Sequence, residues 1–583
     1  MDVVPFGRQF FDSDELASRI GSGRLGGKAD GLIRIRSAVE DHFGRRPVRG
    51  VGVSIPRMTV IATDAFEDFM AKDGAYEAAL SDRPDGRIAQ AFQRLDLPTG
   101  LLGDLRALVE EVRTPLAVRS SSLLEDALAH PFAGVYETKM VPNNDPDPSV
   151  RFRGLVEAVK FVYASTFFRA ARTYRRAVGA DDRAERMAVL IQEVVGGRFG
   201  DRYYPNLSFV CRSLSYYPVG SARPEDGVAQ LALGLGKTIV DGGVCWTYSP
   251  RLPTVPPPFA SAHAMLEETQ KRFWAVNMGR PSAYDPLTET EYLVDLGLDA
   301  AEYDATLRHV ASTYDGGSDR LYPGTGRKGP RVVDFAPVLK LREWPINDAL
   351  QGLLEVGSNA TGSPVEMEGA VALPGNRDGH VRIGLVQVRA MAALGSEVAL
   401  ADEDLEGAGV LLATRTVMGN GSPEGIRDIV YLKPDAFDAR ATRDMAKEVD
   451  ELNRTLMSEG RHYVLVGFGR WGSSDPWLGV PVNWGQVAGA KVIVESTMES
   501  MRIEPSQGSH FFHNMSSLGV VYLSVNAASP TPIDWGILAT LPTLAETGFL
   551  RHVRTPRPLL VRVDGRRRLG LVRLSQVEEE SEA

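Results

Sequence analysis

The segment Pro115-Leu-Ala-Val-Arg-Ser-Ser-Ser122 combines a short apolar run with one arginine and three serines. The run over 115–118 predicts a buried strand, and Arg119 stands at its end. A guanidinium is a planar fork that can bind two phosphate oxygens at once, and neighbouring hydroxyls can support it. The segment therefore indicates a phosphate site at a strand end. The alternative is a surface ion pair of Arg119 with Glu125 or Asp126.

Length and composition indicate a large globular chain. The 583 residues are 43% hydrophobic and 24% charged, with 65 basic and 75 acidic side chains and a net charge of −10. This length predicts roughly three to five folding units, and this composition excludes a disordered or fibrous protein. A net acidic chain is not typical of a general nucleic-acid or anionic-membrane binder, so we expect neither partner.

The cysteine count and the hydropathy pattern indicate the cellular compartment in which the protein is expected. Cys211 and Cys245 are too few for a disulfide framework or a four-cysteine zinc site. No basic segment leads into an apolar stretch at the start, and no run approaches the roughly 18 apolar residues of a membrane span. We expect a cytoplasmic enzyme, for which a homo-oligomer is compatible with the sequence.

Short strands alternate with helices along the chain, which predicts a multidomain α/β (α+β) fold. Helices are expected over 12–20 and 27–41, and five prolines in 250–258 mark a loop. The segment 391–404, small, acidic and alanine-rich, is expected to be a hinge. The expected divisions are 1–185, 186–392 with an insertion at about 250–334, 405–575, and an acidic tail at 576–583.

Glycines near the start form a candidate phosphate turn. Gly21-Ser-Gly-Arg-Leu-Gly26 matches a dinucleotide fingerprint, but that motif requires a preceding strand, and 12–20 is expected to be helical. A P-loop is excluded, because Ser22 and Ala29 occupy two of its required positions. Gly26-Gly27-Lys28 at a helix start still offers backbone N–H groups and a cation suited to phosphate. A plain turn that starts a helix is the alternative.

Two carboxylates alternate in a predicted strand, at Glu366 and Glu368. Residues i and i+2 of a strand point to the same side, so both carboxylates face one place. Like charges held together are unfavourable without a cation, and magnesium bridging nucleotide phosphates is the natural choice. An exposed acidic edge strand is the alternative. Gln387, near the end of the predicted strand 380–388, is an amide that could reach the same site.

The segment Gly508-Ser-His-Phe-Phe-His-Asn-Met-Ser-Ser-Leu-Gly519 predicts one short helix between two glycines. His510 then lies in its first turn, where the helix dipole favours a neutral, nucleophilic ring. Phosphorylation of His510 is chemically credible. Two alternatives are packing of His510 and His513 under the helix, and metal ligation by that pair.

Together these segments resemble the phosphoenolpyruvate synthase and pyruvate phosphate dikinase family. In that family an N-terminal ATP-grasp domain transfers phosphate to a histidine on a swivelling domain. The stretches that carry the resemblance are Gly26–Lys28, 55–70, Ala117–Ser122 with Glu125 and Asp126, Phe132–Thr138, Val189–Val194, Leu233–Gly236, Pro364–Glu368 and Val386–Arg389. The resemblance implies an ATP-grasp domain followed by a smaller α/β phosphohistidine-like domain.

The resemblance also implies ATP and Mg²⁺ as cofactors and gives residues their roles. By likeness, Lys28 and Arg119 bind ATP phosphates and Glu193 lies near the adenine. The same likeness places Gly234 and Gly236 in a later glycine loop, Glu366 and Glu368 on the metal, Gln387 and Arg389 in the terminal strand, and His510 as phosphate carrier. Leu518 and Gly519 follow His510 at the family spacing, although Gly-Ser-His replaces Thr-Ser-His.

Three departures shape the expected activity. Lys237 stands where the family usually has an acidic residue, and 249–334 has no counterpart. The chain ends at 583, which leaves no room for the family's pyruvate-binding barrel. We therefore expect an ATP-dependent phosphotransferase of dikinase type with an unidentified small-molecule or protein acceptor. The alternatives are an ATP-grasp kinase or ligase acting directly on its substrate and an ATP-binding regulatory protein. The loop 467–477 is either an acceptor pocket or a packed structural loop.

Overall fold

A computed structural model describes the chain from residue 3 to residue 575, with gaps. The gaps are residues 8–9, 11–12, 14, 126–133, 178, 219, 258, 260, 282, 375–378, 392–397, 474, 476, 498–510, 512–514 and 516–518. The chain divides into two compact units, the first comprising Met1–Val240 and Val244–Met391 and the second Asp241–Gly243 and Ala392–Ala583. Among the described helices, none combines the length and apolar character that a membrane crossing needs.

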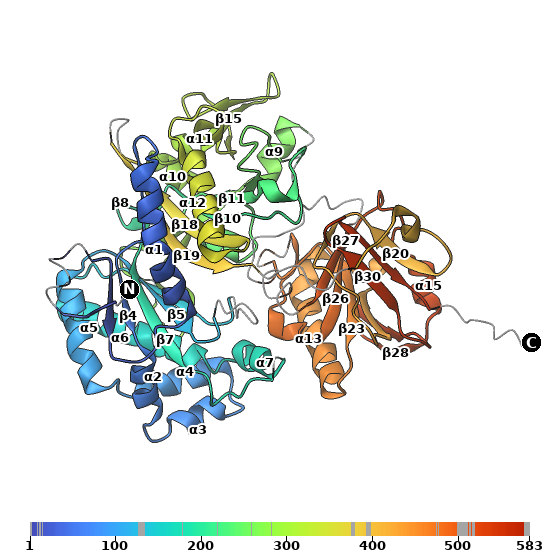
Figure 1. Cartoon of the computed structure of the whole chain (residues 1–583), viewed down its shortest axis with the longest axis horizontal. Helices are drawn as coiled ribbons and strands as arrows, with labels where there is room; N and C mark the ends of the chain where they lie inside the picture. The colour runs from blue at the N-terminus through green and yellow to red at the C-terminus, as the bar shows by residue number, and fades with distance from the viewer. Residues whose placement is uncertain are drawn as a thin grey trace, which may run out of the picture. The chain divides into compact units, whose positions relative to one another are not determined.

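The first sheet of the first unit has the strand order β1-β2-β4-β7-β5-β6 (Figure 1). Its strands are β1 (Val4–Pro5), β2 (Ala17–Ile20), β4 (Met58–Ile61), β5 (Leu116–Ser122), β6 (Thr138–Val141) and β7 (Met187–Glu193). The helices of this part are α1 (Gly27–Arg45), α2 (Thr63–Met70), α3 (Ala75–Leu80), α4 (Asp85–Arg94), α5 (Thr99–Glu111), α6 (Pro148–Ser165) and α7 (Arg169–Ala177). Strand β7 is buried over six of its seven residues, as its apolar sequence predicts.

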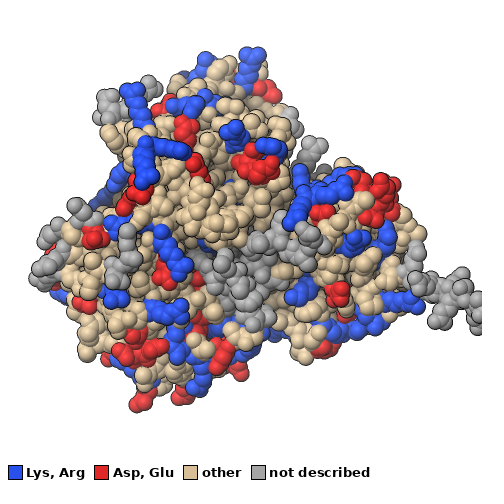
Figure 2. Space-filling model, in the orientation of Figure 1, with Lys and Arg blue, Asp and Glu red and all other residues tan. Residues whose placement is uncertain are grey.

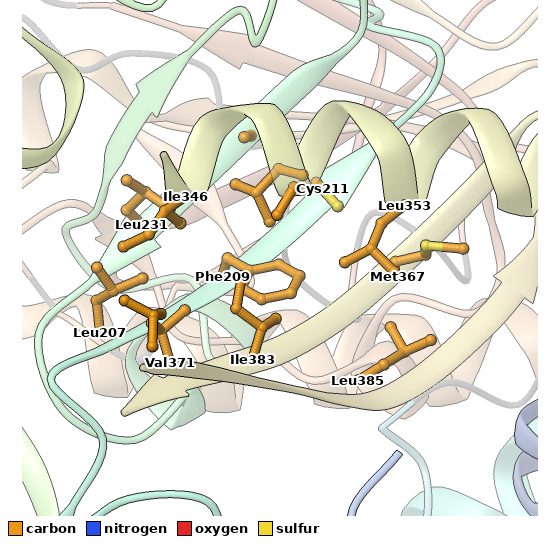
Figure 3. Close-up of a cluster of buried hydrophobic side chains, with 14 of the residues drawn as sticks. Leu207, Phe209, Cys211, Leu231, Ile346, Leu353, Met367, Val371, Ile383 and Leu385 are labelled. Carbon is orange, nitrogen blue, oxygen red and sulfur yellow. The ribbon is translucent and has the colours of Figure 1, made fainter. Parts of the chain in front are cut away.

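The second sheet of this unit has the order β12-β11-β10-β18-β19-β3. Its strands are β3 (Val51–Ser54), β10 (Leu207–Arg212), β11 (Val228–Ala232), β12 (Trp246–Tyr248), β18 (Val365–Ala372) and β19 (Val381–Ala390). Helix α12 (Ile346–Thr361) packs on β10 and β18, and α1 packs on β19 and β3. Figure 3 shows Phe209 at the centre of this core, with Ile346 and Leu353 of α12 above the sheet.

The remaining chain of the first unit forms two small sheets, which include most of the segment expected as an insertion. Their strands are β8 (Gly197–Phe199), β9 (Arg202–Tyr204), β13 (Arg272–Asn277) and β14 (Leu293–Gly297), then β15 (Ala311–Asp315), β16 (Arg320–Pro323) and β17 (Arg331–Val333). The short helices α8 (Lys237–Val240), α9 (Ala262–Glu268), α10 (Leu298–Tyr303) and α11 (Ala336–Leu339) accompany them.

The two large sheets interleave along the chain. Strand β7 begins at Met187 but pairs with β4 and β5 of the first sheet, whereas β3 pairs with β19 of the second. Each of the two large sheets therefore contains strands from before and from after the expected division at residue 185. The expectation of a helix over 12–20 is wrong, because Ala17–Ile20 form β2, which pairs in parallel with β4 and buries Ala17 and Ile20.

The second unit is built on a seven-stranded sheet with the order β21-β27-β26-β23-β22-β29-β28. These strands are β21 (Val417–Met418), β22 (Asp428–Leu432), β23 (Tyr463–Phe468), β26 (Ala490–Ser496), β27 (Val521–Val525), β28 (Thr543–Glu546) and β29 (Leu550–Arg554). Strands β22, β23, β26 and β27 are parallel, and α13 (Thr442–Ser458) connects β22 to β23.

Smaller elements complete this unit. They are β20 (Val410–Thr414), β30 (Leu560–Asp564) and β31 (Leu569–Arg573) in one sheet, β24 (Arg470–Trp471) and β25 (Gly479–Val480) in another, and helix α15 (Trp535–Thr540). One apolar core contains Val466 and Val494 of the large sheet and Val561 and Val572 of the three-stranded sheet. The mixed α/β class is thus confirmed, and the phosphohistidine-like character of this unit stays a prediction.

Charged side chains of both signs are interspersed on the face of the first unit that Figure 2 shows. Helical pairs such as Arg106 and Glu110, with 3.1 Å between Nε and Oε1, contribute to this mixture. Exposed pairs of this kind stabilise a fold by at most about 1 kcal/mol. The surface charges are therefore weak determinants of this fold, whose stability comes mainly from the apolar cores.

Candidate functional site

Arg119 lies in β5 of the first sheet and contacts β19 of the second. Its Nη1 donates to the carbonyl of Val386 at 2.6 Å, and its Nη2 donates to Oε1 of Gln387 at 2.7 Å. Oε1 of Gln192, on the neighbouring strand β7, lies at 3.4 Å. The guanidinium therefore joins the two large sheets of the first unit, and the alternative of a surface ion pair with Glu125 is wrong.

A β-bulge between β18 and β19 creates the acceptor for Arg119. Glu368 pairs with Gln387, but the next residue, Gly369, pairs with Leu385, so Val386 has no residue opposite it. A bulge locally disrupts the ladder of hydrogen bonds, and bulges are common beside functional sites. A side chain at Gly369 would clash, because an added Cβ would lie 2.2 Å from Cζ of Phe209.

The glycine turn before Lys28 rests directly on the end of β5. Gly26 has a φ of 78°, and an added Cβ would lie 1.6 Å from the carbonyl oxygen of Ser121. Only glycine suits this backbone and this approach. The turn therefore places the start of helix α1 beside the end of the strand that carries Arg119.

Lys28 itself is buried and paired. Its Nζ lies 2.6 Å from Oε1 of Glu125 and 3.0 Å from Oγ of Ser120, and the Lys28 and Glu125 side chains are 8% and 1% exposed. The positive charge that Lys28 was expected to offer to phosphate is therefore partly neutralised, because an internal carboxylate lies against its ammonium group. Asp126, the other predicted partner of Arg119, lies outside the described residues.

The three serines after Arg119 make internal hydrogen bonds. Ser120 donates to Glu125 at 2.9 Å, and Ser121 donates to the carbonyl of Leu25 at 2.9 Å and accepts from the N–H of Ala29 at 3.1 Å. Ser122 accepts from the N–H of Glu125 at 3.1 Å. These contacts tie the strand end to the start of α1, so the serines hold the site together.

Glu366 and Glu368 differ in their surroundings, although both point to the same side of β18. The Glu366 side chain is fully buried and forms ion pairs with Arg212 on β10 and Arg389 on β19. The Glu368 side chain is 11% exposed and has Nη2 of Arg389 at 3.4 Å from its Oε1. The like charges of the two carboxylates are thus offset by arginines of the neighbouring strands.

This donor set fits a magnesium ion that also binds nucleotide phosphates. Such an ion typically takes one or two protein carboxylates and completes its shell with phosphate oxygens and water. Glu368 supplies a carboxylate, whereas the amide oxygen of Gln387, which pairs with Glu368 across the strands, accepts a hydrogen bond from Nη2 of Arg119 at 2.7 Å. In the described part of the chain, no three His, Cys, Asp or Glu side chains gather as a metal cluster.

The other predicted nucleotide residues lie at the ends of nearby strands. Glu193 closes β7 and accepts from Oγ1 of Thr114 at 2.9 Å. Gly234 has a φ of 80°, and its added Cβ would lie 2.6 Å from the carbonyl oxygen of Trp274, whereas Gly236 has space around it. Lys237, the departure from the family pattern, pairs with Glu289 at 2.7 Å.

The predicted carrier His510 lies outside the described residues, as does His513. Of the same segment, Phe511 is described, and its ring fills the space at Gly472, where an added Cβ would lie 2.4 Å from its Cγ. In the glycine-rich loop 467–479, Trp471 donates from Nε1 to the carbonyl of Val494 at 3.2 Å. This contact fastens that part of the loop to strand β26.

Sequence reasoning missed Arg212 and Glu125 as members of the site. Arg212 ends the apolar strand Leu207–Arg212, which is the same signal that marked Arg119, so the sequence offered a clue. Glu125 was considered as a partner of Arg119 and as part of the family resemblance, but not as a partner of Lys28. Its pairing with Lys28 depends on two segments 97 residues apart that meet only in the fold.

Comparisons with known proteins match this architecture. The sequence model of the family described as "Pyruvate phosphate dikinase, AMP/ATP-binding domain" matches residues 22–401. Rifampicin phosphotransferase of Streptomyces sviceus is 30% identical over 206 residues, which are 33% of this chain and 22% of that protein. Phosphoenolpyruvate synthase of Aeropyrum pernix is 28% identical over 244 residues, which are 38% of this chain and 26% of that protein.

The alignments thus span about a quarter of each curated relative, while the family match covers well over half of this chain. The matched residues include the second large sheet, the first large sheet apart from β1 and β2, and every candidate residue from Lys28 to Arg389. The resemblance that the sequence motifs predicted is therefore confirmed, and the chain belongs to the pyruvate phosphate dikinase AMP/ATP-binding family, whose nucleotide-binding domain is an ATP-grasp fold.

Proposed function

We propose that this protein is an ATP-dependent phosphotransferase that binds ATP where Arg119 joins the two large sheets. The observation that carries the proposal is the pair of hydrogen bonds from Arg119 of β5 to Val386 and Gln387 of β19. This contact brings Arg119 close to the strand segment that carries Arg389 and faces Glu368. Two guanidinium groups and one carboxylate in a site that is largely shielded from water suit a triphosphate with a divalent cation.

Each group has a distinct task in this proposal. Arg119 and Arg389 orient the phosphates and stabilise the charge that develops during transfer. Glu368 holds Mg²⁺, which when bound neutralises phosphate charge and organises the transferring group, and Gln387 orients Arg119 through its amide oxygen. Lys28, at the start of α1, adds a cation whose field is moderated by Glu125. Glu193 and the loop of Gly234 and Gly236 contribute to nucleotide binding near their strand ends.

The route of the phosphate after ATP is proposed from the sequence of the second unit. In this proposal the neutral ring of His510 attacks the β-phosphorus of ATP, the bond to the α-phosphate breaks and AMP leaves. Water then releases the γ-phosphate as inorganic phosphate, and the β-phosphate that remains on the ring passes to an acceptor oxygen. The printed name of one relative, rifampicin phosphotransferase, supports transfer to an acceptor other than pyruvate. The acceptor is a small molecule or a protein, and rifampicin is one rational test compound.

Two alternatives make different predictions. A kinase or ligase that acts directly on its substrate leaves ADP and needs no phosphohistidine. A regulatory protein binds ATP without turnover. The pairing of Lys237 with Glu289 alters the charge at the glycine loop and is the observation that favours this second alternative.

Product analysis separates these functions. We expect AMP and inorganic phosphate from ATP, and an acid-labile, base-stable label on the protein from ATP labelled in the β-phosphate. The label should disappear in His510→Ala and persist in the matched variant His513→Ala. ADP without labelled protein would instead indicate a direct kinase or ligase, and binding without turnover would indicate a regulatory protein.

A further inference from the structure

Three charged residues form one row across three strands of the second sheet. Arg212 of β10 pairs in register with Glu366 of β18, and Glu366 pairs in register with Arg389 of β19. Residues opposite one another on neighbouring strands project to the same face. The three side chains are almost completely buried, with 4%, 0% and 2% of their surface exposed.

Each oxygen of Glu366 is used by a different arginine. Arg212 donates from Nε and Nη2 to Oε2, and Arg389 donates from Nε at 2.7 Å and from Nη2 to Oε1. The carboxylate therefore lies between two guanidinium groups that approach from opposite sides. A buried carboxylate is stable only when its charge and lone pairs are satisfied in this way.

The same geometry disfavours Glu366 as a metal ligand. A divalent cation at either oxygen would lie next to a guanidinium, and like charges repel strongly where water is excluded. Glu368 is different, because it meets only the edge of Arg389 at 3.4 Å and is 11% exposed. Of the two carboxylates, Glu368 is therefore the one available to a cation.

We propose that Arg212 is a positioning residue, which acts through Glu366 to hold Arg389 beside Glu368, and that Glu366 itself binds no metal. This inference rests on the proposed ATP site and assigns its two carboxylates different roles. With Arg212 on one oxygen, Glu366 cannot turn to present both oxygens to Arg389. The Arg389 guanidinium is thereby kept at the edge that faces Glu368.

The metal assignment is tested by titrating the metal itself. Mn²⁺ replaces Mg²⁺, and its binding in the presence of a non-hydrolysable ATP analogue is followed by electron paramagnetic resonance. We expect Glu368→Gln to lower Mn²⁺ affinity more than about 100-fold and Glu366→Gln only about 10- to 100-fold, as for a group behind the ligands. An equal or larger loss in Glu366→Gln would overturn the assignment.

The role of Arg212 is tested by a double-mutant cycle on ATP binding without metal. We expect Arg212→Met to weaken ATP binding about tenfold, because Arg389 loses its support, and Arg212→Lys to restore part of the affinity. In the Glu366→Gln background, Arg212→Met should weaken ATP binding further by a factor of less than about two. Fully multiplicative losses would show that Arg212 does not act through Glu366 and would sink the proposal.

Arg202→Met is the control for loss of a partly buried ion pair, since the Arg202 and Asp304 side chains are 25% and 3% exposed. Arg202 donates from Nε to Asp304 at 3.0 Å in a small sheet of the same unit and contacts none of the candidate residues. It should lower stability without changing ATP affinity. If Arg212→Met does not fold, Arg212→Lys replaces it in the double-mutant cycle, and its effects on ATP affinity should be smaller and in the same direction. Wild-type protein that binds no ATP would refute the proposed function as well, whereas wild-type binding with multiplicative losses refutes this inference alone.

Discussion

The guanidinium of Arg119 donates a 2.6 Å hydrogen bond to the carbonyl of Val386, the residue that the bulge in β18–β19 leaves without an opposite neighbour. One side chain of the first sheet thus satisfies a backbone group that the second sheet cannot satisfy itself. An unpaired buried carbonyl costs about 1–3 kcal/mol, so this contact stabilises the bulge as well as orienting Arg119.

Substitution of Arg119 by lysine should separate charge from geometry. Lysine keeps the positive charge, but its single ammonium cannot reproduce the fork that reaches both Val386 and Gln387. We expect the affinity for ATP to fall about 10- to 100-fold in Arg119→Lys, as measured by calorimetry. Arg106→Lys, at an exposed helix position, is the control and should bind like the wild type. Equal affinities in both variants would contradict the role of Arg119.

Gly26→Ala should strongly destabilise the first unit. The new Cβ would meet the carbonyl of Ser121 at 1.6 Å, and the φ of 78° adds backbone strain. Gly50→Ala is a matched control, because Gly50 has a φ of 74° but nothing within 4 Å of an added Cβ. We expect roughly 1–2 kcal/mol from strain alone in the control and a clearly larger loss in Gly26→Ala, measured by urea unfolding. Similar losses would mean that the close contact is relieved at little cost.

The pair Lys28 and Glu125 should show strong coupling in stability. Both groups are buried, so removing one leaves the other as an unpaired charge. We expect Lys28→Met and Glu125→Gln each to cost about 3–5 kcal/mol in the free energy of unfolding, and the double variant to cost less than the sum. The exposed pair Arg106 and Glu110 should show a coupling near zero in the same assay. Additive losses at Lys28 and Glu125 would argue against their direct pairing.

Glu495 in β26 should make the stability of the second unit depend on pH. Burial raises the pKa of its carboxyl from 4.5 to about 7, although a hydrogen bond from Tyr522 and the charge of Arg470 act in the opposite direction. The folded state then holds this proton more tightly than the unfolded state. Its stabilising contribution is complete below pH 4.5 and is lost as the pH rises through about 7, by roughly 3 kcal/mol.

Glu495→Gln should remove this dependence. Hydrogen exchange of β23 and β26 amides, measured from pH 5 to about pH 8 and corrected for intrinsic rates, reports the local free energy of opening. We expect Glu495→Gln to become more stable relative to the wild type as the pH rises. In Tyr522→Phe, the loss of stability with rising pH should be steeper than in the wild type. Glu451→Gln removes an exposed carboxylate from α13 and serves as control. Parallel wild-type and Glu495→Gln profiles would exclude Glu495 as the titrating group.

Local patterns in the sequence predicted much of the first unit. The strand predicted around Glu366 and Glu368 forms as Val365–Ala372, because its apolar residues and the neighbouring proline are local signals. The family resemblance carried by Arg119 and its neighbours was confirmed over residues 22–401. The expectation of a helix over 12–20 is wrong, since Ala17–Ile20 form a strand that pairs with β1 on one side and with β4 on the other.

Pairings between distant segments could not be predicted in the same way. Arg212 and Glu366 are 154 residues apart, and their contact depends on the register of β10 and β18. The bulge at Val386 lies beside Gly369, where an added Cβ would meet Phe209 of another strand, and no local pattern predicts this contact. The assignment of both glutamates to a metal was reasoned from one strand alone, without the charges that its neighbours contribute.

The interleaving of the two large sheets has a mechanical consequence. The chain passes between them three times, from β2 through α1 to β3, from β3 to β4, and from β7 through β8 and β9 to β10. A single proteolytic cut in any one connection leaves two covalent links between the sheets. A fragment that starts at residue 186 would carry β7 without its partners and would lack β3 at the edge of the second sheet. Neither large sheet can therefore be obtained with all its strands from a fragment cut between them, so the two sheets form one covalent and structural unit.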